Sequence, residues 1–172
     1  VPKNTPYPWH KDESEKNVGK YMAQQIMLGV PSLTGDLREL SESHIQILKA
    51  WLNFYRRNRN QLFSGRFRPI GFYDLSFPHV KIEGRDRAYI QLGYTGIPAI
   101  TLNQRYQKAY IMNTSESQSL FFVLEGLRNG KYKAQIYDHF LEPIMENTIA
   151  SYGKCYVDLN VPEGGLVRLE RA

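Results

Sequence analysis

The sequence predicts a mainly β protein, in which an antiparallel β-sandwich over residues 65–172 follows a helix–strand–helix segment over residues 1–64. After residue 65, short runs rich in β-branched and aromatic residues alternate with turn residues, and no helical period appears. Before residue 65, hydrophobic residues recur at the spacing of a helix. With 172 residues, 42% of them hydrophobic, the chain is long enough for one domain and part of a second.

The longest predicted helix covers residues 41–64. Ser41 or Ser43 can cap its start, Glu42 suits its first turn, and Gly65 supplies its stop. Gln46, Lys49 and other polar residues take one half of the helical wheel. The other half is apolar and is too wide for a coiled-coil seam, so we expect it to lie on a large surface; it holds Ile47, Leu48, Trp51, Leu52, Phe54, Tyr55 and Leu62.

The region before this helix predicts a loop, a helix and a buried strand. Residues 1–12 hold three prolines and are expected to form a loop. A helix is expected over residues 14–25, and the apolar run at 26–30, closed by Gly29 and Pro31, is expected to be a buried strand. One α/β repeat cannot make a sheet, so this segment predicts the end of something larger.

Eight or nine short strands are expected in the sandwich. Asn129-Gly130 lies between two runs and predicts a hairpin, and the continuous apolar residues 120–124 of the run at 119–125 suit a central strand. The spacing of the runs is typical of sandwiches. The runs cover residues 66–72, 79–83, 87–94, 99–102, 108–113, 119–125, 132–138, 154–161 and 165–171.

Composition argues against several classes of function. The net charge is +5, but five of the arginines crowd at residues 56–59 and 66–68, without a nucleic-acid-binding motif. We therefore interpret them as the solvated face of the long helix and expect no nucleic-acid partner. No run is long enough to span a membrane, and no membrane partner is expected. The histidines lack ligand spacing and Cys155 lacks a partner base, so neither a metal nor another cofactor is expected.

A resemblance to a known family is carried by three stretches. They are residues 28–41 (Leu-Gly-Val-Pro-Ser-Leu-Thr-Gly-Asp-Leu-Arg-Glu-Leu-Ser), residues 51–59, which include a Tyr-Arg-Arg-Asn-Arg block, and residues 65–67. Together they resemble the end of melibiase-type α-galactosidases, which are retaining glycoside hydrolases. The resemblance implies that residues 1–64 are the closing segment of a (β/α)8 barrel and that the sandwich buttresses it. It also implies that both catalytic carboxylates lie upstream, so we assign no catalytic residue and expect the chain alone to be inactive.

The same resemblance implies candidate substrate-binding residues, namely Trp9, His10 and Asp36. Active sites of such barrels lie at the C-terminal ends of the strands, and Asp36 would follow the last strand. The indole of Trp9 could bind the apolar face of a sugar. Simpler interpretations stay open: a packed loop aromatic for Trp9, a solvated histidine for His10, and a turn or cap residue for Asp36.

The expected partners are a carbohydrate substrate and the upstream catalytic barrel. Without that barrel, Met22, Ile26, Leu28 and Val30 would lack a covering surface, which predicts self-association through residues 14–36. The alternative function is a non-catalytic β-sandwich module that binds a glycan or a protein. A self-sufficient module of that kind has no need of the preceding helical segment.

Overall fold

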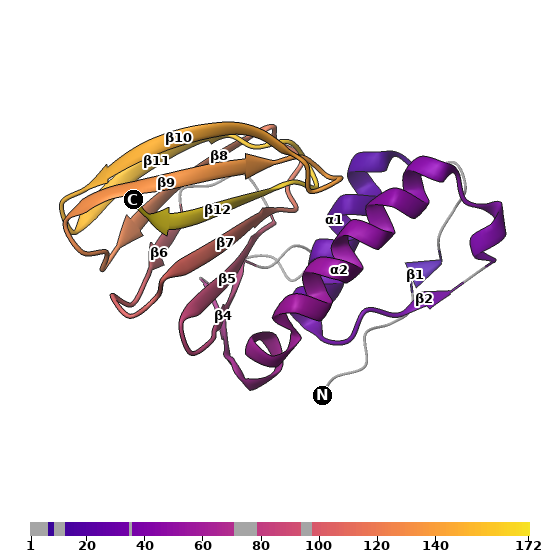
Figure 1. Ribbon diagram of the computed structural model, residues 1–172, viewed down its shortest axis with the longest axis horizontal. Helices are drawn as coiled ribbons and strands as arrows, with labels where there is room; N and C mark the ends of the chain where they lie inside the picture. Colours follow the sequence, from indigo (N-terminus) through magenta and orange to yellow (C-terminus); the bar gives the residue numbers. More distant parts are fainter. Residues whose placement is uncertain (1–6, 9–12, 35, 71–78, 94–97) are drawn as a thin grey trace.

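In the part of the chain that the structure describes, two helices precede ten strands in two mostly antiparallel sheets, so the protein is mainly β (Figure 1). The computed structural model describes residues 7–8, 13–34, 36–70, 79–93 and 98–172. The N-terminal elements are β1 (Tyr7–Pro8), α1 (Glu15–Leu28), β2 (Leu33–Thr34), the 3-10 helix η1 (Leu37–Glu39) and α2 (Glu42–Ser64). The sandwich strands are β3 (Arg66–Pro69), β4 (Val80–Glu83), β5 (Arg87–Leu92), β6 (Ala99–Thr101), β7 (Lys108–Asn113), β8 (Ser119–Glu125), β9 (Gly130–Tyr137), β10 (Pro143–Ser151), β11 (Lys154–Asn160) and β12 (Leu166–Arg171).

The described strands from β3 onward form a seven-stranded sheet, in the order β10-β9-β12-β7-β5-β4-β3, and a three-stranded sheet, in the order β11-β8-β6. The expectation of an antiparallel sandwich is confirmed for most pairs, but β5 pairs with β7, and β6 with β8, in parallel. The reason is topological. The chain leaves β5 for the small sheet, forms β6, and returns to β7 in its original direction. β7 in turn separates β6 from β8.

Two local expectations for the sandwich are wrong. Asn129-Gly130 does join β8 to β9, but β8 lies in the small sheet and β9 in the large one, so the two strands do not form a hairpin. Strand β10 was not expected at all. It begins with a proline and nearly all of its residues are exposed or half-exposed, because it is the edge strand of the large sheet. An edge strand lacks the buried alternation by which strands are recognised.

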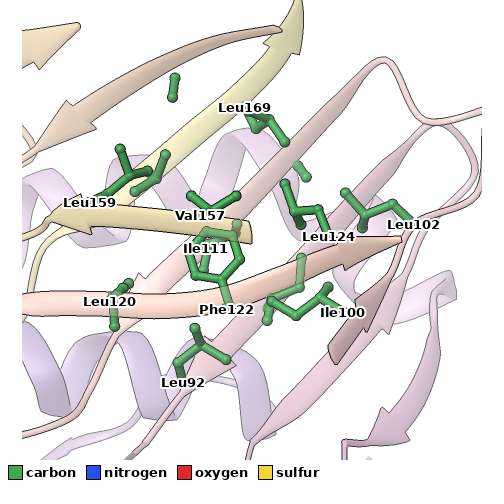
Figure 2. Packing of buried hydrophobic residues seen from close by; sticks show 14 of the residues in the cluster. Leu92, Ile100, Leu102, Ile111, Leu120, Phe122, Leu124, Val157, Leu159 and Leu169 are labelled. Carbon is green, nitrogen blue, oxygen red and sulfur yellow. The ribbon is translucent and has the colours of Figure 1, made fainter. Parts of the chain in front are cut away.

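The main hydrophobic core fills the space between the two sheets. Alternate residues of β5, β7, β9 and β12 point from the large sheet toward β8 and β11 of the small one. Figure 2 shows Phe122 of β8, Val157 of β11 and Ile111 of β7 meeting at the centre of this core. Cys155 is half-buried against the same core, and burial raises the pKa of its thiol. It is a packing residue, as expected.

A second core lies on the opposite face of the large sheet, where the two helices pack. Val18, Met22 and Ile26 of α1 meet Ile47 and Trp51 of α2 above this face. The sheet contributes Val80, Ile82, Tyr89, Met112 and Leu166. The wide apolar half predicted for residues 41–64 is confirmed by the buried and half-buried residues of α2. β5 is buried on both of its faces, because one sheet covers one side and α1 the other.

The strand expected at residues 26–30 does not form. Residues 26–28 end α1, and the backbone N–H of Gly29 donates to the carbonyl oxygen of Gln25 at 3.0 Å. Ile26 extends the spacing of Val18 and Met22, four residues apart, so the helix buries it without a break. Met22 and Ile26 are therefore covered within this chain, contrary to expectation, while Leu28 and Val30 are exposed. The strand of this segment lies later, at β2.

His79 precedes β4, is 3% exposed, and accepts a hydrogen bond from the N–H of Gly93 at its Nδ1, at 3.2 Å. Burial lowers its pKa from 6.5 to about 4. Between pH 6.5 and pH 4, His79 is protonated in the unfolded chain but stays neutral in the folded chain. The contribution of neutral His79 to the free energy of unfolding is therefore fully present above pH 6.5. As the pH drops to 4, we expect the free energy of unfolding to fall by up to about 3 kcal/mol.

Urea unfolding of wild type and His79→Asn at several pH values tests this expectation. Asparagine keeps an acceptor near the position of Nδ1 and cannot titrate, so the variant should lose less stability than wild type below pH 6.5. Equal losses in the two proteins, or an imidazole proton resonance of His79 that titrates near pH 6.5, would contradict the proposed role of burial.

Candidate functional site

The first candidate region is formed by the ends of β1 and β2. These strands pair in parallel, with Tyr7 opposite Leu33 and Pro8 opposite Thr34, and α1 connects them. Their C-terminal ends therefore lie at the same edge. In Figure 1 the helix pair lies between this small ribbon and the sandwich. The described N-terminal elements thus follow the order strand, helix, parallel strand, helix.

Asp36 follows the end of β2 and is the N-cap residue of η1. Its Oδ1 accepts a hydrogen bond from the backbone N–H of Arg38 at 3.0 Å, and its Oδ2 lies 2.6 Å from Nη2 of the same arginine. The hydrogen bonds from the Arg38 side chain and backbone lower the pKa of the Asp36 carboxyl. Asp36 is therefore an ionised cap residue whose oxygens already have donors. Trp9 and His10 lie outside the described residues.

The junction between α1 and the sandwich is held by Glu163, in the loop before β12. Its two oxygens contact Nζ of Lys16 at 2.9 Å and Nζ of Lys20 at 3.1 Å. Lys20 and Glu163 are both buried, and Glu163 is the only buried carboxylate among the described residues. Burial alone would raise the pKa of Glu163, but the hydrogen bonds and charges of the two lysines outweigh it and lower that pKa. Glu163 is thus an ion-pair partner, with no proton to donate near neutral pH.

Two glycines let α1 approach this loop closely. A Cβ on Gly19 would lie 2.8 Å from the carbonyl oxygen of Gly164, closer than atoms can pack. Gly164 has a φ of +73°, which residues with a side chain rarely adopt. A Cβ there would also clash with the carbonyl oxygen of Lys16. The helix pair and the sandwich are thus fitted to each other at this point.

A second candidate region is a cleft of about 390 Å³ between α2 and the outer face of the large sheet. We call it the α2–sheet cleft. Its principal lining residues are Asn53, Phe54 and Arg57 of α2 with Tyr110, Tyr137 and Arg168 of the sheet. The volume lies in the range of small-molecule sites.

Aromatic rings build one wall of the α2–sheet cleft. Tyr110 stacks on Tyr89 at 5.4 Å between ring centroids, and Phe54 meets Tyr110 edge-on at 5.2 Å. The guanidinium of Arg168 lies 5.8 Å from the ring centre of Tyr137, at cation–π distance. These contacts fix the orientation of the rings and of Arg168.

Buried Asn58 fixes the end of the cleft near β5. Its Oδ1 accepts hydrogen bonds from Nη1 of Arg87 and from the hydroxyl of Tyr89, both at 2.9 Å. Its Nδ2 donates to the carbonyl oxygen of Phe54 at 2.8 Å. Arg87 also lines the cleft, so its hydrogen bond to Asn58 links a cationic side chain of β5 to α2. Burial raises the pKa of Tyr89, which therefore keeps its proton as a donor.

Sequence reasoning did not identify the α2–sheet cleft. Tyr110 and Arg168 alternate with core residues, a pattern that predicts an outward face without saying what covers it. Arg56, Arg57 and Arg59 are exposed on α2, as expected for a solvated face. Only the packing of α2 on the sheet shows that Arg57 alone of these three lines the cleft.

No three histidine, cysteine or acidic side chains among the described residues come close enough together to bind a metal ion. Neither α1 nor α2, in the described part of the chain, has the length and apolarity of a membrane span.

Fold and packing thus define a β-sandwich with a helix pair packed on its large sheet and a parallel two-stranded ribbon. No protein-family model matches the sequence, and no curated protein matches it either. Among solved structures, the chain resembles part of a putative alpha-N-acetylgalactosaminidase from Bacillus halodurans C-125, with a TM-score of 0.48 and 11% sequence identity. The match covers 94% of this chain and 33% of the other, so the chain spans about a third of that structure.

Proposed function

We propose that this chain is the C-terminal part of an α-galactosidase-like retaining glycoside hydrolase. β1, α1, β2 and α2 would close its catalytic (β/α)8 barrel, and β3–β12 would form the sandwich that buttresses the barrel. The observation that carries the proposal is the parallel pairing of β1 and β2 across α1, with α2 following.

A two-stranded parallel ribbon of this size is not expected to be stable by itself. Parallel strands joined by a helix belong to larger sheets, and a pair of two-residue strands contributes little stability by itself. The helices lie between the ribbon and the sandwich, so they would have strands on both sides (Figure 1). Strands inside and helices outside is the arrangement of a (β/α)8 barrel. A self-sufficient binding module, the alternative function, gains nothing from this ribbon.

The position of β2 supports the family resemblance and adjusts it. The strand that would close the barrel was expected at residues 26–30, whereas the observed strand is Leu33–Thr34. Gly35 and Asp36 then come directly after the strand, where barrel active sites lie. Because Arg38 holds the carboxylate of Asp36, we assign Asp36 to shaping the rim of the site. Trp9 and His10 follow β1 in the sequence and complete the proposed substrate-binding set.

The chemistry would come from two carboxylates on other strands of the barrel, about 5 Å apart in a retaining enzyme. The substrate would be a sugar with a terminal α-linkage. The sandwich would keep the last two barrel helices in place through the Glu163 ion pairs and the second core. Leu28 and Val30, which are exposed, would face the rest of the barrel or, in its absence, another copy.

The complete gene product that carries this chain tests the proposal, with aryl α-galactoside and aryl α-N-acetylgalactosaminide as probes. We expect turnover of at least one, with the α-anomer released first in a proton NMR time course. The 172-residue chain alone should show none. Failure of the complete product to hydrolyse any α-glycoside, or turnover by the 172-residue chain, would overturn the proposal.

Asp36 supplies the second arm of this test. In the active product, Asp36→Ala should raise KM severalfold with a smaller change in kcat, because it loosens the rim and leaves the reacting carboxylates in place. Glu39→Ala, at an exposed neighbour on η1, is the matched control and should change neither constant. Equal effects of the two substitutions would remove Asp36 from the site.

A further inference from the structure

We propose that the α2–sheet cleft binds an acidic sugar, a pyranose ring that carries a carboxylate. This site is separate from the strand ends to which the glycosidase reaction is assigned above. The assignment rests on the charges, the unused hydrogen-bonding groups and the shape of the α2–sheet cleft, each of which is described below.

The charges around the cleft leave an excess of cations. Arg57, Arg87 and Arg168 line it, and none of the described residues that line it is a carboxylate. Two of these arginines have a carboxylate partner: Asp86 lies 3.8 Å from Nε of Arg87, and Glu170 lies 3.3 Å from Nη2 of Arg168. Glu170 also contacts Lys108 at 3.2 Å, so its charge is shared between two cations. Arg57 forms no ion pair with any residue that the structure describes.

Several polar groups of the cleft have no protein partner. Nε of Arg168 is buried without a hydrogen-bond acceptor in the described structure, which is costly for a charged donor. The hydroxyls of Tyr110 and Tyr137 likewise form no hydrogen bonds within the described ranges. A carboxylate is the acceptor whose geometry suits guanidinium donors, and sugar hydroxyls suit phenols and the amide of Asn53.

The walls select a ring over a bare anion. Phe54, Phe140 and Leu141 add apolar surface that inorganic phosphate or sulfate would leave unused. A purely aromatic acid would cover this surface but would leave the tyrosine hydroxyls and Asn53 without partners. A carboxylated pyranose offers a flat C–H face, a ring of hydroxyls and one negative charge, and so matches all three features.

Calorimetric titration of the 172-residue chain with galacturonate and glucuronate tests the proposal, with galactose and inorganic phosphate as comparison ligands. At least one sugar acid should bind, at least about tenfold more tightly than galactose, and more weakly as salt is added. Galactose binding as tightly as the acids would refute the role of the arginines. If phosphate bound as tightly as the sugar acids, the site would be a general anion site, and the proposed recognition of the sugar ring would be wrong.

Two neighbouring arginines locate the site. Arg57→Gln should weaken binding about fivefold to tenfold, since it removes one charge-assisted contact at an exposed residue on which folding does not depend. Arg56→Gln, equally exposed on α2 but outside the cleft, removes the same charge and should change affinity less than twofold. Equal effects, or no binding of either acid by the wild-type chain, would overturn the assignment. Neither outcome bears on glycosidase activity, which is measured at the strand ends.

Discussion

Replacing Trp51 with alanine is expected to lower the free energy of unfolding by about 3–5 kcal/mol. Trp51 is fully buried in the second core, where its Nε1 donates to the carbonyl oxygen of His139 at 3.0 Å. Its ring meets Phe54 edge-on at 5.9 Å. Alanine would leave a large cavity between the helices and the sheet and an unpaired carbonyl oxygen. Urea unfolding followed by circular dichroism measures the loss.

Two substitutions frame the result for Trp51. Trp51→Phe keeps a ring and should cost about 1–3 kcal/mol, because it loses the hydrogen bond and part of the volume. Lys49→Ala, at an exposed position of the same helix, should stay within about 0.5 kcal/mol of wild type. If Trp51→Ala cost no more than Lys49→Ala, α2 would not be packed on the sheet in solution.

Replacing Glu163 with alanine is the other change with a large expected effect, about 3–5 kcal/mol. The substitution leaves the buried ammonium of Lys20 with only Glu116, whose side chain is 88% exposed and hydrated. Glu116→Gln is the matched control and should cost less than about 0.5 kcal/mol, since an exposed ion pair contributes little. A loss at Glu163 as small as that at Glu116 would show that Lys20 reaches solvent.

The same carboxylate should make stability depend on pH. Its folded pKa is lowered, so its contribution is present above the ordinary value of 4.5 and is lost as the pH falls through the folded pKa. The difference in stability between wild type and Glu163→Gln should therefore shrink as the pH drops below 4.5. A difference that stays constant in acid would exclude the ionised carboxylate as its source.

Periodicity predicted the long helix because apolar residues recur at its period from Ile47 to Leu62. The run at 26–30 was too short to distinguish a strand from a helix end by its apolar character alone. The structure decides for helix, because Ile26 extends the buried stripe of Val18 and Met22 into the contact with α2. That contact joins residues that are distant in the sequence, so a short stretch of sequence cannot predict it.

The local sequence pattern also could not predict which strands pair with each other. Most strands of the sandwich were predicted near their observed positions, but whether β8 and β9 share a sheet depends on partners far along the chain. The candidate site divides in the same way. That Asp36 could be a cap was predicted from its place after a glycine. Arg57 and Arg168, more than a hundred residues apart in the sequence, both line the α2–sheet cleft, and only tertiary packing brings them there.

The place of β12 has a consequence for synthesis on the ribosome. Among the described strands, β12 lies between β9 and β7 and alone joins the pair β10–β9 to the group β7–β5–β4–β3. Until residues 166–171 leave the exit tunnel, the nascent chain holds two separate sheets, each with an additional bare edge. Closure is a late and non-local event, which makes folding slow and favours chaperone protection during translation. A message truncated before Leu166 would yield a protein that lacks a central strand and is prone to aggregate.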